Sequence, residues 1–265
     1  MMRDRRFSGD GLARYAMFAG LAKTRSRSTH RLALYGVGMA CPPLRVSDTT
    51  SGVRTLALDR PARRNALDLA TVRALRAELA RSGARAIVVA SAVEGIFCAG
   101  ADLSIDAGER AEVSRELYAL YGEMGAAAVP VIAALDGPAV GGGAQLAIAA
   151  DLRIAGPHAW IRFVGPGHGL AVGAWGLPSL VGRGRAIDLC LSGRRVDRAE
   201  AQAIGLVERL ADDPITAAQA LATEWSALDA GAVARVKAIA VAGIAPADAL
   251  ALEAEGNASW EGATG

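Results

Sequence analysis

The chain has 265 residues, of which 52% are hydrophobic and 21% charged, and its formal net charge at pH 7 is +2. This hydrophobic share suffices for a packed core and excludes an intrinsically disordered protein, and no apolar run is long enough to predict a membrane span. Cys41, Cys98 and Cys190 lie far apart without paired spacing, which excludes a disulfide framework and indicates reduced thiols in a cytoplasmic protein.

The N-terminal segment is strongly basic. Residues 1–47 hold nine Lys/Arg and two Asp/Glu, whereas the rest of the chain holds 20 basic and 25 acidic residues. A nucleic-acid-binding arm is one interpretation, but regular basic spacing and interleaved aromatics are missing. A transit peptide, rich in Arg and Ser and poor in acids, is a second. We favour a poorly ordered extension over residues 1–52, or an upstream start codon, because organised periodicity begins only after Gly52.

From Val53 onward, apolar periodicity predicts alternating strands and helices. In chain order we expect strand 53–59, helix 69–82, strand 84–91, helix 109–127, strand 130–135, a helix ending at 149, strand 151–155, and helices 183–191, 197–204, 214–228, 231–242 and 246–259. Asp68 is the expected N-cap of the first helix. This alternation predicts an α/β layered domain over 53–196, followed by a mostly helical region over 197–265.

Two glycine-bearing loops each follow a buried strand and lead into a helix. They read GIFCAGADLSI, from Gly95, and GPAVGGGAQLAIA, from Gly137. A helix N-terminus presents unpaired N–H groups and the positive end of the helix dipole. Two such termini that converge can hold one negatively charged oxygen, and we expect the backbone amides of Ala101 and Gly142 to be its donors. Either loop alone could be a simple strand-to-helix turn.

Four segments together resemble the enoyl-CoA hydratase/isomerase, or crotonase, family. They are LDRPARRNALD (58–68), ARAIVVASAVEGIFCAGADLS (84–104), PVIAALDGPAVGGGAQLAIAADLRIA (130–155) and GLAVGAWGLPSLVGRGRAIDLCLSGRRVDRAEAQAIGLVERL (169–210), in the family's order and spacing. The resemblance implies an α/β fold, a crotonase-like spiral of ββα units with a helical C-terminal oligomerisation region. It also implies an acyl-CoA or enoyl-CoA substrate in fatty acid metabolism, and a homotrimer or dimer of trimers.

The resemblance also assigns site residues. It places the thioester carbonyl between the N–H groups of Ala101 and Gly142, which agrees with the choice made from the two loops. It implies substrate-binding positions at Arg63, Arg64, Ala66, Ala99, Asp102, Leu103 and Trp175. Coenzyme A is part of the substrate, so no separate cofactor is expected. No metal-ligand spacing is present, and neither nucleic acid nor a membrane is an expected partner.

The pattern breaks where hydratases of this family carry two glutamates that act as base and acid. Gln145 stands at the first position, and an amide is not basic enough to deprotonate water. A glycine, Gly165 or Gly167 depending on the alignment, stands at the second. His168 is our first candidate for a replacement base. The weaker candidates Asp106, Glu109 and Glu123 have structural interpretations as helix-start or exposed-face residues.

Two functions remain open on this sequence. One is an enzyme, a lyase or isomerase that polarises a thioester carbonyl and acts through an enolate, with an unusual acid/base residue. The other is a catalytically silent acyl-CoA-binding scaffold or regulatory subunit that keeps the same backbone site.

Overall fold

The computed structural model describes residues 43–243. The expected helix 246–259 and almost all of the basic segment lie outside these residues. The elements are, in chain order, β1 (Leu44–Asp48), β2 (Val53–Leu58), η1 (Pro61–Arg63), α2 (Leu69–Ala80), β3 (Ala86–Ser91), α3 (Ala107–Ala126), β4 (Val131–Leu135), β5 (Ala139–Val140), α4 (Gly142–Ala149), β6 (Leu152–Ala155), β7 (Trp160–Arg162), η2 (Pro166–His168), α5 (Leu177–Val181), α6 (Arg183–Ser192), β8 (Val196–Asp197), α7 (Arg198–Ala203), β9 (Arg209–Leu210), α8 (Pro214–Ser226) and α9 (Ala230–Val241).

The main sheet has six strands in the order β1-β2-β3-β4-β6-β9. β1 is antiparallel to β2, and the remaining pairs are parallel. A second sheet contains β5, β7 and β8. The expected α/β alternation is therefore confirmed. The prediction that organised structure starts at Val53 was wrong, because β1 begins at Leu44 and forms a hairpin with β2.

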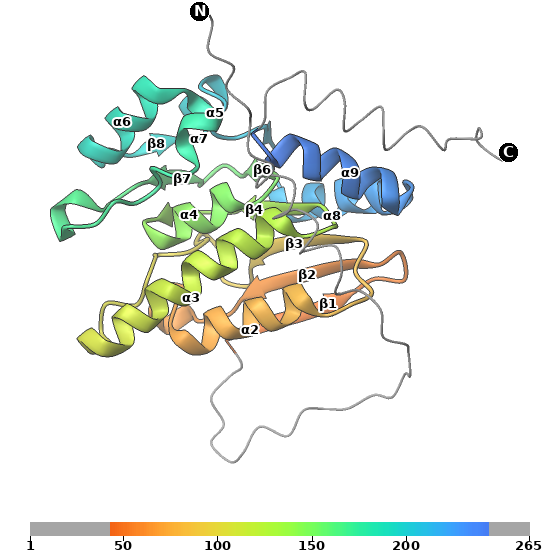
Figure 1. Cartoon of the computed structure of the whole chain (residues 1–265), viewed down its shortest axis with the longest axis horizontal. Coiled ribbons are helices and arrows are strands. Elements are labelled where there is room, and N and C mark those ends of the chain that lie inside the picture. Colours follow the sequence, from red (N-terminus) through yellow and green to blue (C-terminus); the bar gives the residue numbers. More distant parts are fainter. Residues whose placement is uncertain (1–42, 244–265) are drawn as a thin grey trace, which may run out of the picture. The chain divides into compact units, whose positions relative to one another are not determined.

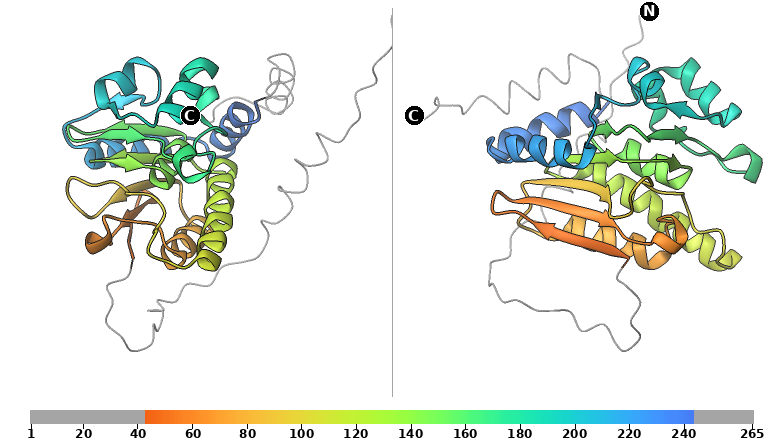
Figure 2. Two further views of the ribbon diagram at one scale, coloured as in Figure 1. Left: turned by 90° about the vertical axis from the view of Figure 1, so that its left-hand side faces the viewer. Right: turned by 180° about the vertical axis from the view of Figure 1, so that it is seen from behind.

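Helices cover both faces of the main sheet. α2 and α3 lie side by side on one face, and α4 packs against α3 (Figures 1 and 2). Alternate strand residues such as Leu56, Ile87 and Val89 belong to the core on that side. Their neighbours, such as Val88 and Ile132, form a second core with α8 on the opposite face. This is why the central strands read as continuous apolar runs.

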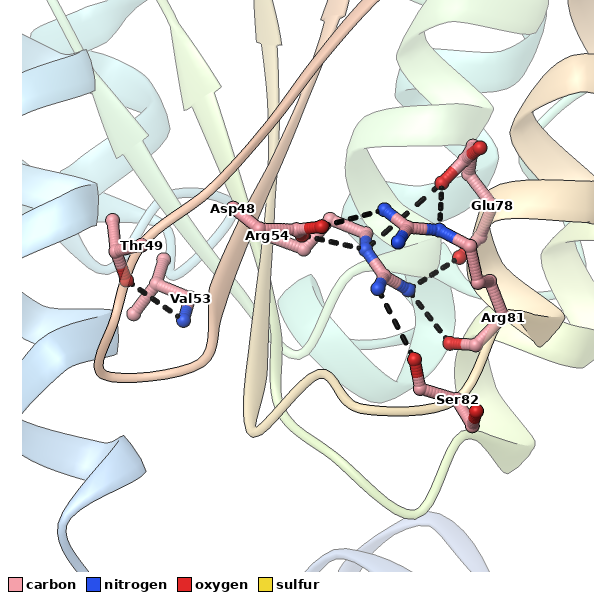
Figure 3. A network of polar contacts seen from close by, with 7 residues as sticks. All are labelled: Asp48, Thr49, Val53, Arg54, Glu78, Arg81 and Ser82. Carbon is pink, nitrogen blue, oxygen red and sulfur yellow. Dashed lines mark hydrogen bonds and ion pairs between the residues drawn. The ribbon is translucent and has the colours of Figure 1, made fainter. Parts of the chain in front are cut away.

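A buried arginine joins β2 to the end of α2 (Figure 3). Arg54 is 2% exposed, and its guanidinium donates to the carbonyl oxygens of Glu78, Arg81 and Ser82 at 3.0, 2.6 and 3.2 Å. Its Nε pairs with Asp48 Oδ1 at 2.8 Å. The carbonyls at a helix C-terminus lack intrahelical donors and carry partial negative charge. Arg54 satisfies two of them, those of Glu78 and Arg81, and also the carbonyl of Ser82 just beyond the helix.

Replacing Arg54 with methionine is expected to lower the free energy of unfolding by about 2 to 3 kcal/mol, because buried carbonyls lose their donors. Urea denaturation measures the change. Arg81→Ala is the matched control: its side chain is 44% exposed and pairs with Asp48 on the same surface, so it should cost less than about 1 kcal/mol. Equal losses in the two variants would contradict the role given to Arg54.

A second buried cation fixes α9. Lys237 Nζ donates to Met124 O at 2.8 Å and Val129 O at 3.0 Å, and lies 2.8 Å from Asp151 Oδ2. The same carboxylate accepts from Val131 N at 2.7 Å, so Asp151 fixes the turn that precedes β6. Burial lowers the pKa of Lys237 and raises that of Asp151, against the mutual attraction of the pair. The pair ties α9 to the end of α3.

Candidate functional site

The loops that follow β2, β3 and β4 are joined by backbone hydrogen bonds. Leu67 N donates to Gly100 O at 2.7 Å, and Asp102 N donates to Leu67 O at 3.0 Å. Val140 N donates to Cys98 O at 3.0 Å. All three loops leave the carboxyl ends of parallel strands, the edge at which open α/β sheets bind ligands.

Asn65 locks the first of these loops against the second. Its buried side chain accepts from Arg60 N at 2.8 Å and donates to Ser91 Oγ at 2.8 Å and Phe97 O at 3.0 Å. Its backbone is left-handed, with φ of 56°, a conformation that asparagine tolerates better than most residues. Asn65 was not predicted as a site residue; its position directly after the charged turn at Arg63 and Arg64 was the available signal.

Two glycines allow the second and third loops to approach closely. Gly100 has φ of +103°, and a Cβ there would lie 2.8 Å from Val140 O and 3.4 Å from Gly142 N. A Cβ on Gly143 would lie 2.4 Å from Cys98 O. Any side chain at either position would push the start of α4 away from the preceding loop.

The backbone nitrogens of Ala101 and Gly142 lie next to each other. A Cβ added to Gly142 would be 3.2 Å from Ala101 N, and Gly142 opens α4, where N–H groups lack intrahelical acceptors. Neither nitrogen donates a hydrogen bond within the part of the chain that the structure describes. Two unpaired donors therefore lie close together at the start of α4.

Gln145 lies one turn further along α4, with only 5% of its surface exposed. Its Oε1 accepts from Gly173 N at 3.1 Å and from Trp175 Nε1 at 3.0 Å. Its Nε2 has no hydrogen-bond partner among residues 43–243. The amide is thus oriented with its oxygen engaged and its NH₂ group available.

An aromatic group lies beside these atoms. The Trp175 ring stacks on Tyr121, with centroids 6.0 Å apart and an interplanar angle of 15°. Tyr121 meets Tyr118 edge-on and donates through its hydroxyl to Gly142 O at 2.9 Å. Trp175 is 48% exposed, so it forms a solvent-facing apolar surface next to Gln145. Tyr121 was not predicted as a site residue, although two tyrosines three residues apart on one predicted helix were a visible signal.

The titratable groups that contact the two loops are not poised to take up a proton. Hydrogen bonds from Ser104 and the charge of Arg60 lower the pKa of Asp102, which is thereby held ionised. Burial raises the pKa of Tyr121, and raises that of Cys98 to about 12. Tyr121 and Cys98 are therefore neutral near pH 7.

Cys98 is expected to resist alkylation by iodoacetamide in the native protein at about pH 8, because the thiolate is the reactive form and burial suppresses it. Its Sγ also donates to Asn65 O at 3.1 Å. Peptide mass spectrometry after labelling, with and without urea, measures the modified fraction. Cys190, which is only partly buried, is the internal comparison. Labelling of Cys98 in the folded protein at the rate of Cys190 would contradict this prediction.

The candidate bases lie in different surroundings. His168 is exposed at the end of η2. Asp106 caps α3 by accepting from Glu109 N at 2.9 Å, in keeping with its helix-start interpretation. Glu123 pairs with Arg76. Within residues 43–243, no hydrogen bond or ion pair joins any of these side chains to Ala101, Gly142 or Gln145.

The other predicted substrate-binding residues surround the first two loops. Arg63 and Arg64 are exposed and form no ion pair with the described residues. Ala66 and Ala99 are half-buried in the paired loops, and Leu103 is exposed. Asp102 is engaged with Arg60 and Ser104, which gives it a structural role at this position.

Residues 43–243 contain neither a candidate metal site nor a candidate membrane span. No group of three or more His, Cys, Asp or Glu side chains there is arranged to hold a metal ion. No helix in this range is both long and apolar enough to cross a membrane.

The chain is similar in sequence and in structure to several known proteins. Residues 48–259 match the sequence profile described as enoyl-CoA hydratase/isomerase. The chain is 39% identical over 193 residues to the probable enoyl-CoA hydratase echA6 of Mycobacterium tuberculosis, covering 71% of this chain and 78% of that protein. It is 36% identical over 202 residues to the enoyl-CoA isomerase/hydratase claC of Penicillium crustosum, of which it spans only 22%. The crystal structure of an enoyl-CoA hydratase from Bacillus anthracis superposes with a TM-score of 0.77 at 28% identity, covering 82% of this chain and 90% of that one.

Proposed function

Because the chain belongs to the enoyl-CoA hydratase/isomerase family, we propose that it binds a CoA thioester with the carbonyl oxygen between Ala101 N and Gly142 N. Removal of a proton from C2 of the acyl group sends its electron pair onto that oxygen and forms an enolate. The two N–H groups stabilise the resulting negative charge. The observation that carries the proposal is that both donors are adjacent and unpaired in the described residues.

The surroundings of the two donors support the same proposal. Arg63 and Arg64 are exposed and available for the phosphates of coenzyme A. Trp175 offers an apolar surface to the acyl chain. His168 remains the proposed acid/base residue and would have to approach C2 from the loop that carries η2.

A second candidate function, binding without chemistry, is favoured by one observation. Of the titratable side chains that contact the two loops in the described range, Asp102 is held by Arg60 while Cys98 and Tyr121 stay protonated. A silent acyl-CoA-binding subunit needs no base.

Assembly and location belong to the same proposal. Exposed Ile187 and Leu191, four residues apart on α6, support burial against other subunits in a homotrimer or dimer of trimers. The free thiols of Cys98 and Cys190 are in keeping with a cytoplasmic protein. Sedimentation equilibrium tests the trimer.

The proposed function is tested in heavy water with butyryl-CoA and crotonyl-CoA. Mass spectrometry follows deuterium uptake at C2, and absorbance follows loss of the conjugated thioester. Exchange or turnover supports the enzyme. Binding of both thioesters without exchange or turnover supports the silent subunit. Failure to bind either thioester would overturn both.

A further inference from the structure

The orientation of the Gln145 amide is fixed by its partners. The N–H groups of Gly173 and Trp175 both point at one atom of the amide, and only an oxygen can accept them. Turning the amide over would set an NH₂ group against two N–H donors and leave those donors unpaired, which is costly in a buried site. Gln145 therefore presents donors only, through Nε2.

Nε2 is close to the position proposed for the thioester. Gln145 lies three residues after Gly142 on α4, and residues with this spacing share one helix face. Helical side chains lean toward the helix N-terminus, so the Gln145 side chain leans toward the Ala101 and Gly142 donors. The stacked rings of Trp175 and Tyr121 connect Gln145 with Gly142, because Tyr121 donates to Gly142 O and Trp175 donates to Gln145 Oε1.

We propose that Gln145 Nε2 donates a hydrogen bond to an oxygen on C3 of the acyl group, so that the site prefers 3-oxoacyl-CoA thioesters to unsubstituted ones. This inference rests on the proposed function, since it takes the thioester oxygen to lie between Ala101 N and Gly142 N. C3 is two bonds beyond the thioester carbon and is the part of the acyl chain that would come next along α4.

The chemistry of the surroundings selects a ketone. Nε2 is the unpaired donor of a residue that is 95% buried and that lies beside the indole of Trp175. A saturated chain would cover this N–H group without pairing it, which penalises binding. A ketone oxygen accepts and has no proton of its own to be buried, so it matches a site that offers only donors.

Acetoacetyl-CoA and butyryl-CoA, which differ at C3, provide the test. Isothermal titration calorimetry is expected to give about tenfold tighter binding of acetoacetyl-CoA to the native chain, the contribution of one hydrogen bond. Gln145→Met should remove this preference, so that the two thioesters bind with about equal affinity. Gln145→Glu is nearly isosteric, and one of its oxygens can still accept from Gly173 and Trp175. The other oxygen replaces the NH₂ donor with an acceptor, so butyryl-CoA should then bind more tightly than acetoacetyl-CoA. Trp175→Phe, which removes one of the two orienting donors, should reduce the preference for acetoacetyl-CoA.

Each possible result of this titration either supports or contradicts the proposed contact between Gln145 and the oxygen on C3. The inference is supported if the preference for acetoacetyl-CoA over butyryl-CoA decreases in the order native chain, Trp175→Phe, Gln145→Met, Gln145→Glu. Equal affinities in the native chain, or a preference that survives Gln145→Met, would overturn it while leaving the proposed function in place. Failure of both thioesters to bind the native chain would instead overturn the proposed function itself. Circular dichroism establishes that each variant is folded before its ratio is compared.

Discussion

Changing Gly142 to proline is expected to lower the rate of deuterium exchange at C2 of a bound acyl-CoA by about 100- to 1000-fold, the usual consequence of removing one oxyanion donor. Proline lacks the N–H group but suits the first position of a helix, which Gly142 occupies. The preceding Gly141, with φ of 53° and ψ of −115°, adopts the mirror image of an extended conformation that glycine can hold before proline. Exchange followed by mass spectrometry measures the loss.

Two control variants separate loss of the donor from damage to the helix. Ala230→Pro places proline at the first position of α9, away from the site, and should leave the exchange rate unchanged. Gly142→Ala keeps the N–H group, so its exchange rate should fall less than that of the proline variant. Some loss is expected, because the added Cβ would lie 3.2 Å from Ala101 N. If Gly142→Pro exchanges at the native rate, this amide does not hold the thioester oxygen.

Much of the fold could be predicted because its signals are local. The buried strands β3 and β4 are continuous apolar runs, and Asp68 caps α2 by accepting from Thr71 N at 2.8 Å. The strands that were missed lack such signals. β1 has only Leu44 buried, and β5, β8 and β9 have two residues each. Their pairing is set by distant partners in the folded chain.

Part of the site could likewise be predicted from local sequence, whereas another part depends on residues far apart in the chain. The two glycine loops could be recognised from strand-glycine-helix order, and both this order and the resemblance predicted Ala101 and Gly142 as the donors. The orientation of Gln145 could not be predicted, because its partners Gly173 and Trp175 lie 28 and 30 residues later in a glycine-rich segment. An amide stands at the position where the family carries a carboxylate. The N–H groups of Gly173 and Trp175 occupy its oxygen, so that only its NH₂ group can bind a substrate, as a hydrogen-bond donor.

The second large effect is expected at the contact between β6 and β9. Arg153 is 1% exposed, its Nη2 pairs with Glu208 Oε1, and its Nη1 donates to Ala150 O at 2.8 Å. Glu208 Oε2 also accepts from Arg153 N at 2.7 Å. Glu208→Ala would remove the carboxylate that pairs directly with a buried guanidinium, which then keeps only the weaker attraction of Asp151, and should lower the free energy of unfolding by about 3 to 5 kcal/mol. Urea denaturation monitored by circular dichroism measures this loss.

The double variant Arg153→Met/Glu208→Ala tests the cause. Because the cost of breaking a buried pair comes mainly from the charge that remains, removing both partners should recover most of the stability lost in Glu208→Ala. Arg153 Nε has no hydrogen-bond partner among the described residues, so an apolar side chain also removes an unsatisfied polar atom. A double variant as unstable as Glu208→Ala would show that the carboxylate's bond to the β6 backbone, rather than the stranded charge, accounts for the loss.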